Sequence, residues 1–477
     1  MSETSDEQSD GAKLLYHAKN YLRASVLASV LSTFNFLILT YILNVEEYGY
    51  LSIFNSLVSV LTILYLLNSH SGVARLLLDR RDDWGDILGA NLLFTGVWAT
   101  CMILGLFWGA EWIIQSFALP REVFFWACVV AIFSSAYQYL MIYLSTDQQS
   151  ARHAKLSVRR KLITVTLVVS WVLWLDEERY LGKIYAEILI GSSFALYSII
   201  ELLKLARFRV RAAHLTTSLR YGLPLIPHTL SRYILSYFDQ LQINQISGGA
   251  DTGRYSFAAN IAIFMGFIVT AAGKAWHPIF IDKYQDRKIE EIEELSRPYA
   301  KKIFLAACAI SLLVGDVIYL IVPSSYHAGV PLIPIIVLGY TFVFMYTLYF
   351  QYTSFRKRTE LISIATLLAG VINIMLNAQL IPIYGYQAAA YTTALSFAIL
   401  LSLHYINARY ILKEQVIRLT TLLPGAITTI LITLGASDLY THRLERSALF
   451  TYGAKAALVA LTLFMFYNSK RDTHEHT

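Results

Sequence analysis

Apolar runs close to 20 residues long recur from one end of this 477-residue chain to the other. About 20 apolar residues are what an α-helix needs to cross the hydrocarbon core of a bilayer. Only 15% of the residues are charged, against roughly 25% in soluble proteins. Because a lipid-exposed segment must satisfy its backbone polar groups internally, the sequence predicts an all-α polytopic membrane protein.

The apolar runs predict about fourteen transmembrane helices. Their ranges are 23–43, 50–72, 88–109, 123–145, 162–175, 184–203, 221–245, 255–281, 303–322, 331–353, 361–381, 386–407, 417–435 and 448–467. The fifth is short for a span. It is retained because, without it, the basic loops on either side would lie on opposite faces of the membrane.

The mixed-charge stretch 282–302 is expected to form a short amphipathic helix on the cytoplasmic surface.

Lys and Arg residues predict the orientation, because cytoplasmic loops retain them. With the N-terminus inside, most of the 39 Lys and Arg residues fall in inside segments. The outside loops contain Arg121, Arg179, Lys183, Arg254, Arg443 and Arg446. We therefore expect both termini to be cytoplasmic, with residues 1–12 as an acidic tail. Topology explains the net charge of +6, so nucleic-acid binding is not expected.

The two halves of the chain show a short similarity, for which chance is the alternative explanation. Glu47-Tyr48-Gly49 and Asp251-Thr252-Gly253 each follow a long predicted helix, and Tyr384-Gly385-Tyr386 is a third instance. We expect an outside turn at each site, with a positive φ at the glycine. Internal repeats are common in transporters, whose substrate sites lie at the repeat interface near the midplane.

Charged residues inside the predicted seventh span point to a polar path. His228, Arg232 and Asp239 lie four and seven residues apart, so a regular helix would place them on one face. A charge at bilayer depth costs about 2.5–3.5 kcal/mol on insertion scales, and such residues usually face protein or a watery cavity. Lys274 and His277, three residues apart in the eighth span, share a second face. Lys455, in the fourteenth span, is expected to snorkel outward.

Several motifs together resemble a known family of exporters. They are Tyr221-Gly222-Leu223-Pro224-Leu225 with the later Asp239, Gly253-Arg254-Tyr255-Ser256-Phe257-Ala258-Ala259, Glu46-Glu47-Tyr48-Gly49, Ser71-Gly72-Val73-Ala74-Arg75, and Tyr384-Gly385-Tyr386-Gln387-Ala388-Ala389-Ala390. Over roughly residues 20–435 the chain resembles Wzx-type polysaccharide and O-antigen flippases of the multidrug/oligosaccharidyl-lipid/polysaccharide (MOP) exporter superfamily. Pro227 and His228 depart from the usual pattern of the family, which has an apolar or small pair at this place.

The resemblance implies two pseudo-repeated six-helix lobes in a V, with two additional C-terminal helices. On that plan the chain divides into a cytoplasmic tail, an N-lobe, a cytoplasmic linker, a C-lobe, and a final helix pair with a cytoplasmic tail. The corresponding ranges are 1–22, 23–203, 204–220, 221–407 and 408–477.

The implied substrate is an undecaprenyl-diphosphate-linked oligosaccharide, flipped by alternating access from the cytoplasmic to the outer leaflet of the bacterial inner membrane. Surface polysaccharide such as O-antigen or capsule would be the product. The implied partners are this lipid-linked oligosaccharide and membrane lipids. The resemblance leaves open coupling to a proton or sodium gradient, and association with a polysaccharide polymerase and a chain-length regulator. It implies no cofactor, no metal site and no catalytic residue.

Cations are the residues expected to meet the diphosphate, because they can replace its hydration and Arg matches phosphate geometry. Arg232 and Lys274 are the main candidates, and Arg75 and Arg23 are gatekeeper candidates at cytoplasmic span ends. The alternatives are an ion pair for Arg232, snorkelling for Lys274, and topology marking for the other two. The remaining candidates for a coupling or structural ion pair are Asp239, His277 and His228.

An ion-coupled multidrug exporter of the same superfamily is the competing function. Such exporters carry acidic residues deep in the N-lobe, whereas the predicted N-lobe spans here lack a deep Asp or Glu. Cations in the C-lobe repel cationic drugs and suit a diphosphate. An enzyme such as a polymerase would normally show a large outside loop with catalytic charges, and the predicted outside loops are short.

Overall fold

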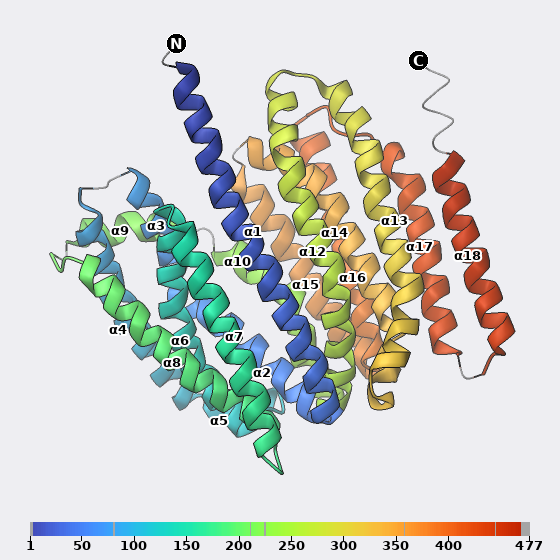
Figure 1. The fold of residues 1–477 in the computed structure, drawn as a ribbon, viewed down its shortest axis with the longest axis horizontal. Coiled ribbons are helices and arrows are strands. Elements are labelled where there is room, and N and C mark those ends of the chain that lie inside the picture. Colours follow the sequence, from blue (N-terminus) through green and yellow to red (C-terminus); the bar gives the residue numbers. More distant parts are fainter. Residues whose placement is uncertain are drawn as a thin grey trace. The chain divides into compact units, whose positions relative to one another are not determined.

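The structure is a computed structural model that describes residues 3–79, 82–209, 211–223, 226–356, 358–443 and 445–468, and in these ranges every regular element is helical (Figure 1). The helices up to residue 222 are α1 (Glu3–Ile42), α2 (Val45–Leu66), α3 (Ser69–Asp79), α4 (Trp84–Trp108), α5 (Ala110–Ser116), α6 (Arg121–Thr146), α7 (Ser150–Trp174), α8 (Tyr180–Leu205) and α9 (Ala212–Gly222). Those that follow are α10 (Ile226–Tyr233), η2 (Ile234–Phe238), α11 (Asp239–Ser247), α12 (Gly249–Gln285), α13 (Ile289–Ile321), η3 (Ser324–Gly329), α14 (Leu332–Phe355), α15 (Thr359–Tyr384), α16 (Gln387–Ile406), η4 (Asn407–Ile411), α17 (Leu419–Thr441) and α18 (Ala448–Asn468).

The chain forms two compact units, Met1–Leu230 and Ser231–Thr477. In unit 1, α1 packs on α7, α2 and α8 pack on α6, and α7 packs on α8. In unit 2, α14 packs on α12, α16 and α17, while α15 packs on α16 and α13 on α17. The boundary between the units lies within α10, inside the segment that the sequence assigns to the seventh span.

In the described part of the chain, each of the fourteen predicted spans is mostly helical. Among the described residues, eleven helices are long and apolar enough to cross a membrane. The seventh predicted span is divided among short helices, and α7 carries a basic first half (SARHAKLSVRRK) that lowers its hydropathy. The all-α polytopic membrane fold expected from the sequence is confirmed.

Two local predictions are wrong. No separate surface helix forms at 282–302, because α12 runs to Gln285 and α13 begins at Ile289 and continues to Ile321, about 50 Å in all. Gly49 and Gly253 lie within helices, and the residues that turn the chain are Asn44, which caps α2, and Gly248, with φ +86°. The third predicted turn glycine, Gly385, does have a positive φ of +73°.

Helix α9 docks on the joint between α2 and α3 in unit 1. Leu67 and Asn68 at this joint have left-handed φ values of 45° and 53°. The Asn68 side chain donates a hydrogen bond to Thr229 Oγ1 at 3.1 Å. A Cβ atom on Gly222 would lie 2.8 Å from the Asn68 carbonyl oxygen, and one on Gly72 would overlap the carbonyl oxygen of Ser218. Only glycine fits at both positions, because the backbone of α9 there contacts the backbone at Asn68 and Gly72 directly.

We expect Gly72→Ala to lower the free energy of unfolding by about 1–3 kcal/mol, the usual cost of overpacking a tight contact. Thermal unfolding of the purified protein measures this. Gly96→Ala in α4 is the matched control, because a Cβ atom at Gly96 meets nothing within 4 Å. Equal melting temperatures for the two variants would contradict the close docking of α9.

Helix α18 is attached to the rest of unit 2 by a partly buried ion pair. Figure 1 shows α18 beside α17. Lys455 Nζ lies 2.7 Å from Asp316 Oδ2 of α13 and 4.6 Å from the centre of the Tyr440 ring. Tyr440 donates in turn to the Leu312 carbonyl oxygen at 2.7 Å. The prediction that Lys455 snorkels outward is wrong, because the side chain has this partner and is only 10% exposed.

Lys455→Met is expected to destabilise the attachment of α18 by about 2 kcal/mol. This is less than the ~3–5 kcal/mol of a fully buried pair, because the Asp316 side chain is one-third exposed. The double variant Lys455→Met/Asp316→Leu should recover most of the loss, since no charge is left without a partner. Protease protection of the C-terminal helix and thermal unfolding test this, and a double variant weaker than the single one would contradict it.

Candidate substrate and ion-coupling site

The predicted seventh span is interrupted by a π-helical turn, η2, between Arg232 and Asp239. A π-helical turn holds more residues than an α-helical turn and shifts the face that later residues occupy. Seven residues therefore do not return the chain to the same side. Arg232 lies on an exposed surface, whereas Asp239 is buried with 2% of its surface exposed. The structure does not form the ion pair considered from the sequence, and the two charged groups have separate surroundings.

Asp239 is the centre of a buried polar cluster in unit 2. Its Oδ2 accepts hydrogen bonds from Tyr255 Oη and Thr393 Oγ1, both at 2.6 Å, and its Oδ1 accepts one from Asn377 Nδ2 at 2.6 Å. These donors come from α12, α16 and α15. No Lys or Arg pairs with Asp239 among the residues that the structure describes. The carboxylate on α11 is thus held by neutral donors from three other helices.

A second layer of amides and hydroxyls surrounds these donors. Asn377 also donates to Gln242 Oε1 at 3.2 Å and accepts from Thr392, and Asn373 donates to Thr393 Oγ1 at 3.1 Å. Asn373 Oδ1 is buried and has no hydrogen-bond partner within the described ranges. A carboxylate with nearby amide and hydroxyl oxygens can accept a proton or a small hard cation, for which oxygen ligands are suitable.

The sequence pattern indicates Asp239 but not the residues that donate to it. Asn373 and Asn377 are four residues apart on one predicted span, so one helical face carries two amides. Thr392 and Thr393 stand in the next span. The amide pair was a detectable signal, but only the structure shows that it faces the carboxylate.

Arg232 lies beside tyrosines on the other side of η2. Its Cζ atom is 5.9 Å from the centre of the Tyr233 ring, and Tyr233 stacks on Tyr237 with centroids 5.5 Å apart. Arg232 forms no ion pair among the described residues. An exposed guanidinium next to stacked phenol rings can bind a phosphate group and contact sugar faces.

Lys274 and His277 are both exposed on α12, three residues apart. Lys274 has no ion-pair partner in the described part of the chain. The Nδ1 atom of His277 lies 3.3 Å from Gln351 Oε1 of α14. A free lysine and a histidine held by a neutral amide therefore share one face, as predicted.

The structure gives less support for the other three candidate residues as parts of a substrate site. Arg75 is exposed and its Nε donates to Asp79 Oδ2 at 3.0 Å, which partly neutralises it. Arg23 is exposed on α1. His228 lies on α10, but its side chain is outside the described residues.

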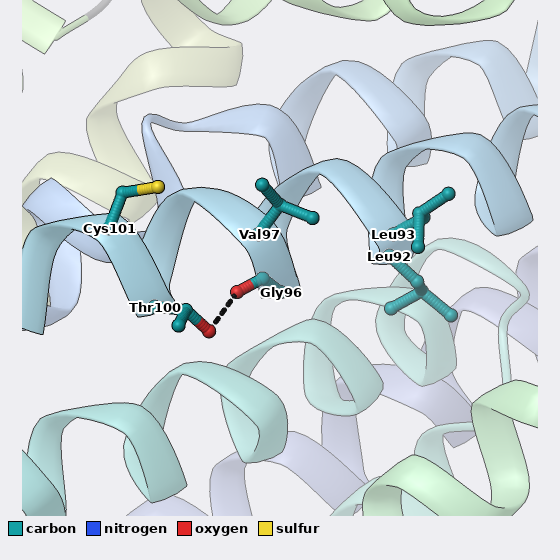
Figure 2. Close-up of a pocket in the computed structure, with 6 residues that line it drawn as sticks. All are labelled: Leu92, Leu93, Gly96, Val97, Thr100 and Cys101. Atoms are coloured by element: carbon teal, nitrogen blue, oxygen red, sulfur yellow. Dashed lines mark hydrogen bonds between the residues drawn. The ribbon is translucent and has the colours of Figure 1, made fainter.

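A cavity of 460 Å³ on α4 does not fit a polar ligand. Figure 2 shows its lining of Leu92, Leu93, Gly96, Val97, Thr100 and Cys101. The hydroxyl of Thr100 donates to the Gly96 carbonyl oxygen at 2.9 Å. Because the lining is mostly apolar, we do not place the substrate there.

A family of known proteins matches the first part of the chain. The model of the family described as "Polysaccharide biosynthesis protein" matches residues 21–284, more than half of the chain. The chain belongs to this family. A Haemophilus influenzae relative, "Lsg locus putative protein 1", is 25% identical in an alignment of 266 residues that covers 53% of this chain and 63% of the relative. The match therefore spans less than two thirds of that relative's length.

Solved structures of MOP-superfamily transporters share the fold. The inward closed conformation of lipid II flippase MurJ aligns with a TM-score of 0.68 at 13% identity, covering 95% of this chain and 99% of that one. An inward-facing multidrug resistance MATE family transporter of the MOP superfamily aligns at 0.62 and 13% identity, covering 85% and 95%. These identities show the fold alone. The polysaccharide family member is thus a multi-pass membrane protein with a MOP-type transporter fold.

Proposed function

We propose that this family member flips undecaprenyl-diphosphate-linked oligosaccharide repeat units from the cytoplasmic to the outer leaflet, for O-antigen, capsule or similar surface polysaccharide. The observation that carries the proposal is the pair of exposed cations, Arg232 and Lys274, neither ion-paired among the described residues. They stand on a MOP-type fold in a chain of the polysaccharide biosynthesis family. Free cations on the helices of a polytopic membrane protein suit a diphosphate, which must replace its water while it crosses lipid.

We further propose that transport proceeds by alternating access and is driven by an ion gradient through Asp239. The carboxylate is buried, it has no cationic partner in the described part of unit 2, and hydroxyl and amide groups surround it. Binding a proton or sodium ion would neutralise it, and release would restore the charge. Because Asp239 joins α11 to α12, α15 and α16, this change of charge acts on the packing of unit 2.

In this account the protein resides in the bacterial inner membrane with both termini cytoplasmic. The lipid tail remains in the bilayer, and the diphosphate and sugars follow the polar surface. A polymerase and a chain-length regulator are the partners expected to receive the flipped product.

The alternative is an ion-coupled multidrug exporter, which the MATE-like fold also allows. Cells that lack the protein distinguish the two. We expect a diphosphate-linked oligosaccharide to accumulate on the cytoplasmic side while surface polymer disappears, and the intact gene to reverse both. Unchanged lipid-linked sugars with new sensitivity to cationic drugs would support the exporter instead.

A further inference from the structure

Unit 1 contains a charged group that the proposed function does not use. Lys183 was predicted to lie in an outside loop, but α8 begins at Tyr180 and Lys183 belongs to its first turn. Only 9% of Lys183 is exposed. A lysine so buried in a helix that can span the membrane is costly, and it marks a functional position more often than a topology signal.

The Lys183 ammonium lies at the middle of a neighbouring span. Its Nζ donates to Asn55 Oδ1 at 3.1 Å. Asn55 is ten residues into the 22-residue helix α2, or about 15 Å from its start. Within residues 51–66 of α2, Asn55 is the one exposed residue. The buried ammonium is therefore hydrogen-bonded to the one exposed polar side chain on this part of α2.

Positive charges are in excess around this ammonium. Lys161 of α7 and Glu187 of α8 both act electrostatically on Lys183, and Arg160 acts on Lys161. The Arg160 Cζ atom stands 4.2 Å above the centre of the Tyr137 ring. One carboxylate thus accompanies three cations, so the region keeps an excess of positive charge. The positive end of the α8 dipole adds to the same potential.

Close packing fixes the two helices that carry these charges. A Cβ atom on Gly182 would lie 2.8 Å from the Trp171 carbonyl carbon and the Val172 nitrogen, so the backbones of α7 and α8 touch. This contact holds α7, which carries Lys161, in a defined position relative to α8, which carries Lys183. None of the three cations forms an ion pair among the described residues. The excess charge is built into the packing of unit 1 and has no protein counter-ion there.

We infer that Lys183, Asn55 and Lys161 form a second binding site, for an anionic oxygen group of the transported molecule. The inference rests on the proposed function and deepens it. The Lys183 ammonium has three N–H donors, and one of them binds Asn55 Oδ1. The exposed Asn55 side chain has N–H donors of its own. Both groups can therefore donate to the same anion. The anion is either a carboxylate on an acidic sugar or a phosphate of the lipid carrier, since both present the same oxygens.

Binding of two lipid probes to the purified full chain distinguishes these sources. One probe is a polyprenyl diphosphate with a neutral trisaccharide, and the other has one glucuronic acid in the trisaccharide. Lys183→Met is expected to weaken binding about 10-fold, a typical loss for a charge-assisted hydrogen bond. Lys183→Arg should keep most of the affinity. Lys155→Met, at an exposed lysine of α7, should change neither probe.

A loss confined to the acidic probe assigns the site to the glycan, and an equal loss with both probes assigns it to the diphosphate. Unchanged binding of both probes overturns the inference, as does an equal loss in Lys183→Arg accompanied by a lower melting temperature. If the wild type binds neither lipid probe, the proposed function fails. Thermal stabilisation by sodium glucuronate or inorganic diphosphate then tests the anion site alone, and the inference fails if Lys183→Met is stabilised as much as the wild type.

Discussion

Arg232→Ala and Lys274→Ala are each expected to lower transport of lipid-linked oligosaccharide by about 10- to 100-fold, while insertion into the membrane stays normal. A charge-assisted hydrogen bond contributes about 1.5–3 kcal/mol, and 1.4 kcal/mol is a factor of ten. Both side chains are exposed, so their removal leaves no buried partner behind. The expected loss is therefore in substrate binding and transport, with little effect on folding. Surface polymer per cell, at matched protein level, measures it.

Two matched variants make this test specific. Arg232→Lys keeps the charge but not the bidentate geometry, so it should retain part of the activity. Lys283→Ala removes another cation of α12, but Lys283 Nζ already lies 2.8 Å from Glu291 Oε2, and transport should be unchanged. Normal surface polymer in both alanine variants would show that these cations do not bind the diphosphate, even if the flippase assignment holds.

Asp239→Asn is expected to abolish the response of transport to an ion gradient. The amide has nearly the shape of the carboxylate and can still accept from Tyr255 and Thr393. It can neither take up a proton as a carboxylate does nor supply the charge that holds a cation. In liposomes, we expect wild-type flipping to accelerate when a proton or sodium gradient is imposed, and the variant to flip at one rate with or without the gradient.

The control for this variant is Asp251→Asn at the start of α12. Asp251 Oδ1 lies 2.6 Å from Arg254 Nη1 in a local ion pair, so its loss should leave the gradient response intact. A gradient response that survives in Asp239→Asn would remove Asp239 from the coupling mechanism. If the wild type itself shows no response, the protein is not ion-coupled.

The sequence predicts the fold well because bilayer-length apolar runs are a strong and redundant signal. Apolar runs do not predict whether a single charged residue near a span end is buried, or which residue it contacts. Lys183 follows a short fifth span and resembles a loop residue, yet α8 begins three residues earlier and buries it against Asn55. Lys455 looks like a snorkelling lysine because its partner, Asp316, is 139 residues away. Such pairings depend on tertiary packing, which local pattern does not contain.

The sequence predicts some residues of the candidate site but not how they are arranged, again because the arrangement depends on tertiary packing. Charged residues in a span are visible one by one, so Arg232, Asp239 and Lys274 could be named. Their relation could not be derived, because a regular α-helix was assumed where η2 inserts a π-helical turn. The neutral partners of Asp239 lie up to 154 residues away.

The most direct test is to measure flipping by the purified protein in liposomes. A fluorescent polyprenyl-diphosphate oligosaccharide is placed in both leaflets, and a membrane-impermeant quencher reports how fast the inner population becomes accessible. We predict a rate that rises with protein content and returns to the protein-free level in the Arg232→Ala/Lys274→Ala double variant. A wild-type rate equal to that of protein-free liposomes, together with gradient-driven transport of a cationic dye, would contradict the flippase account.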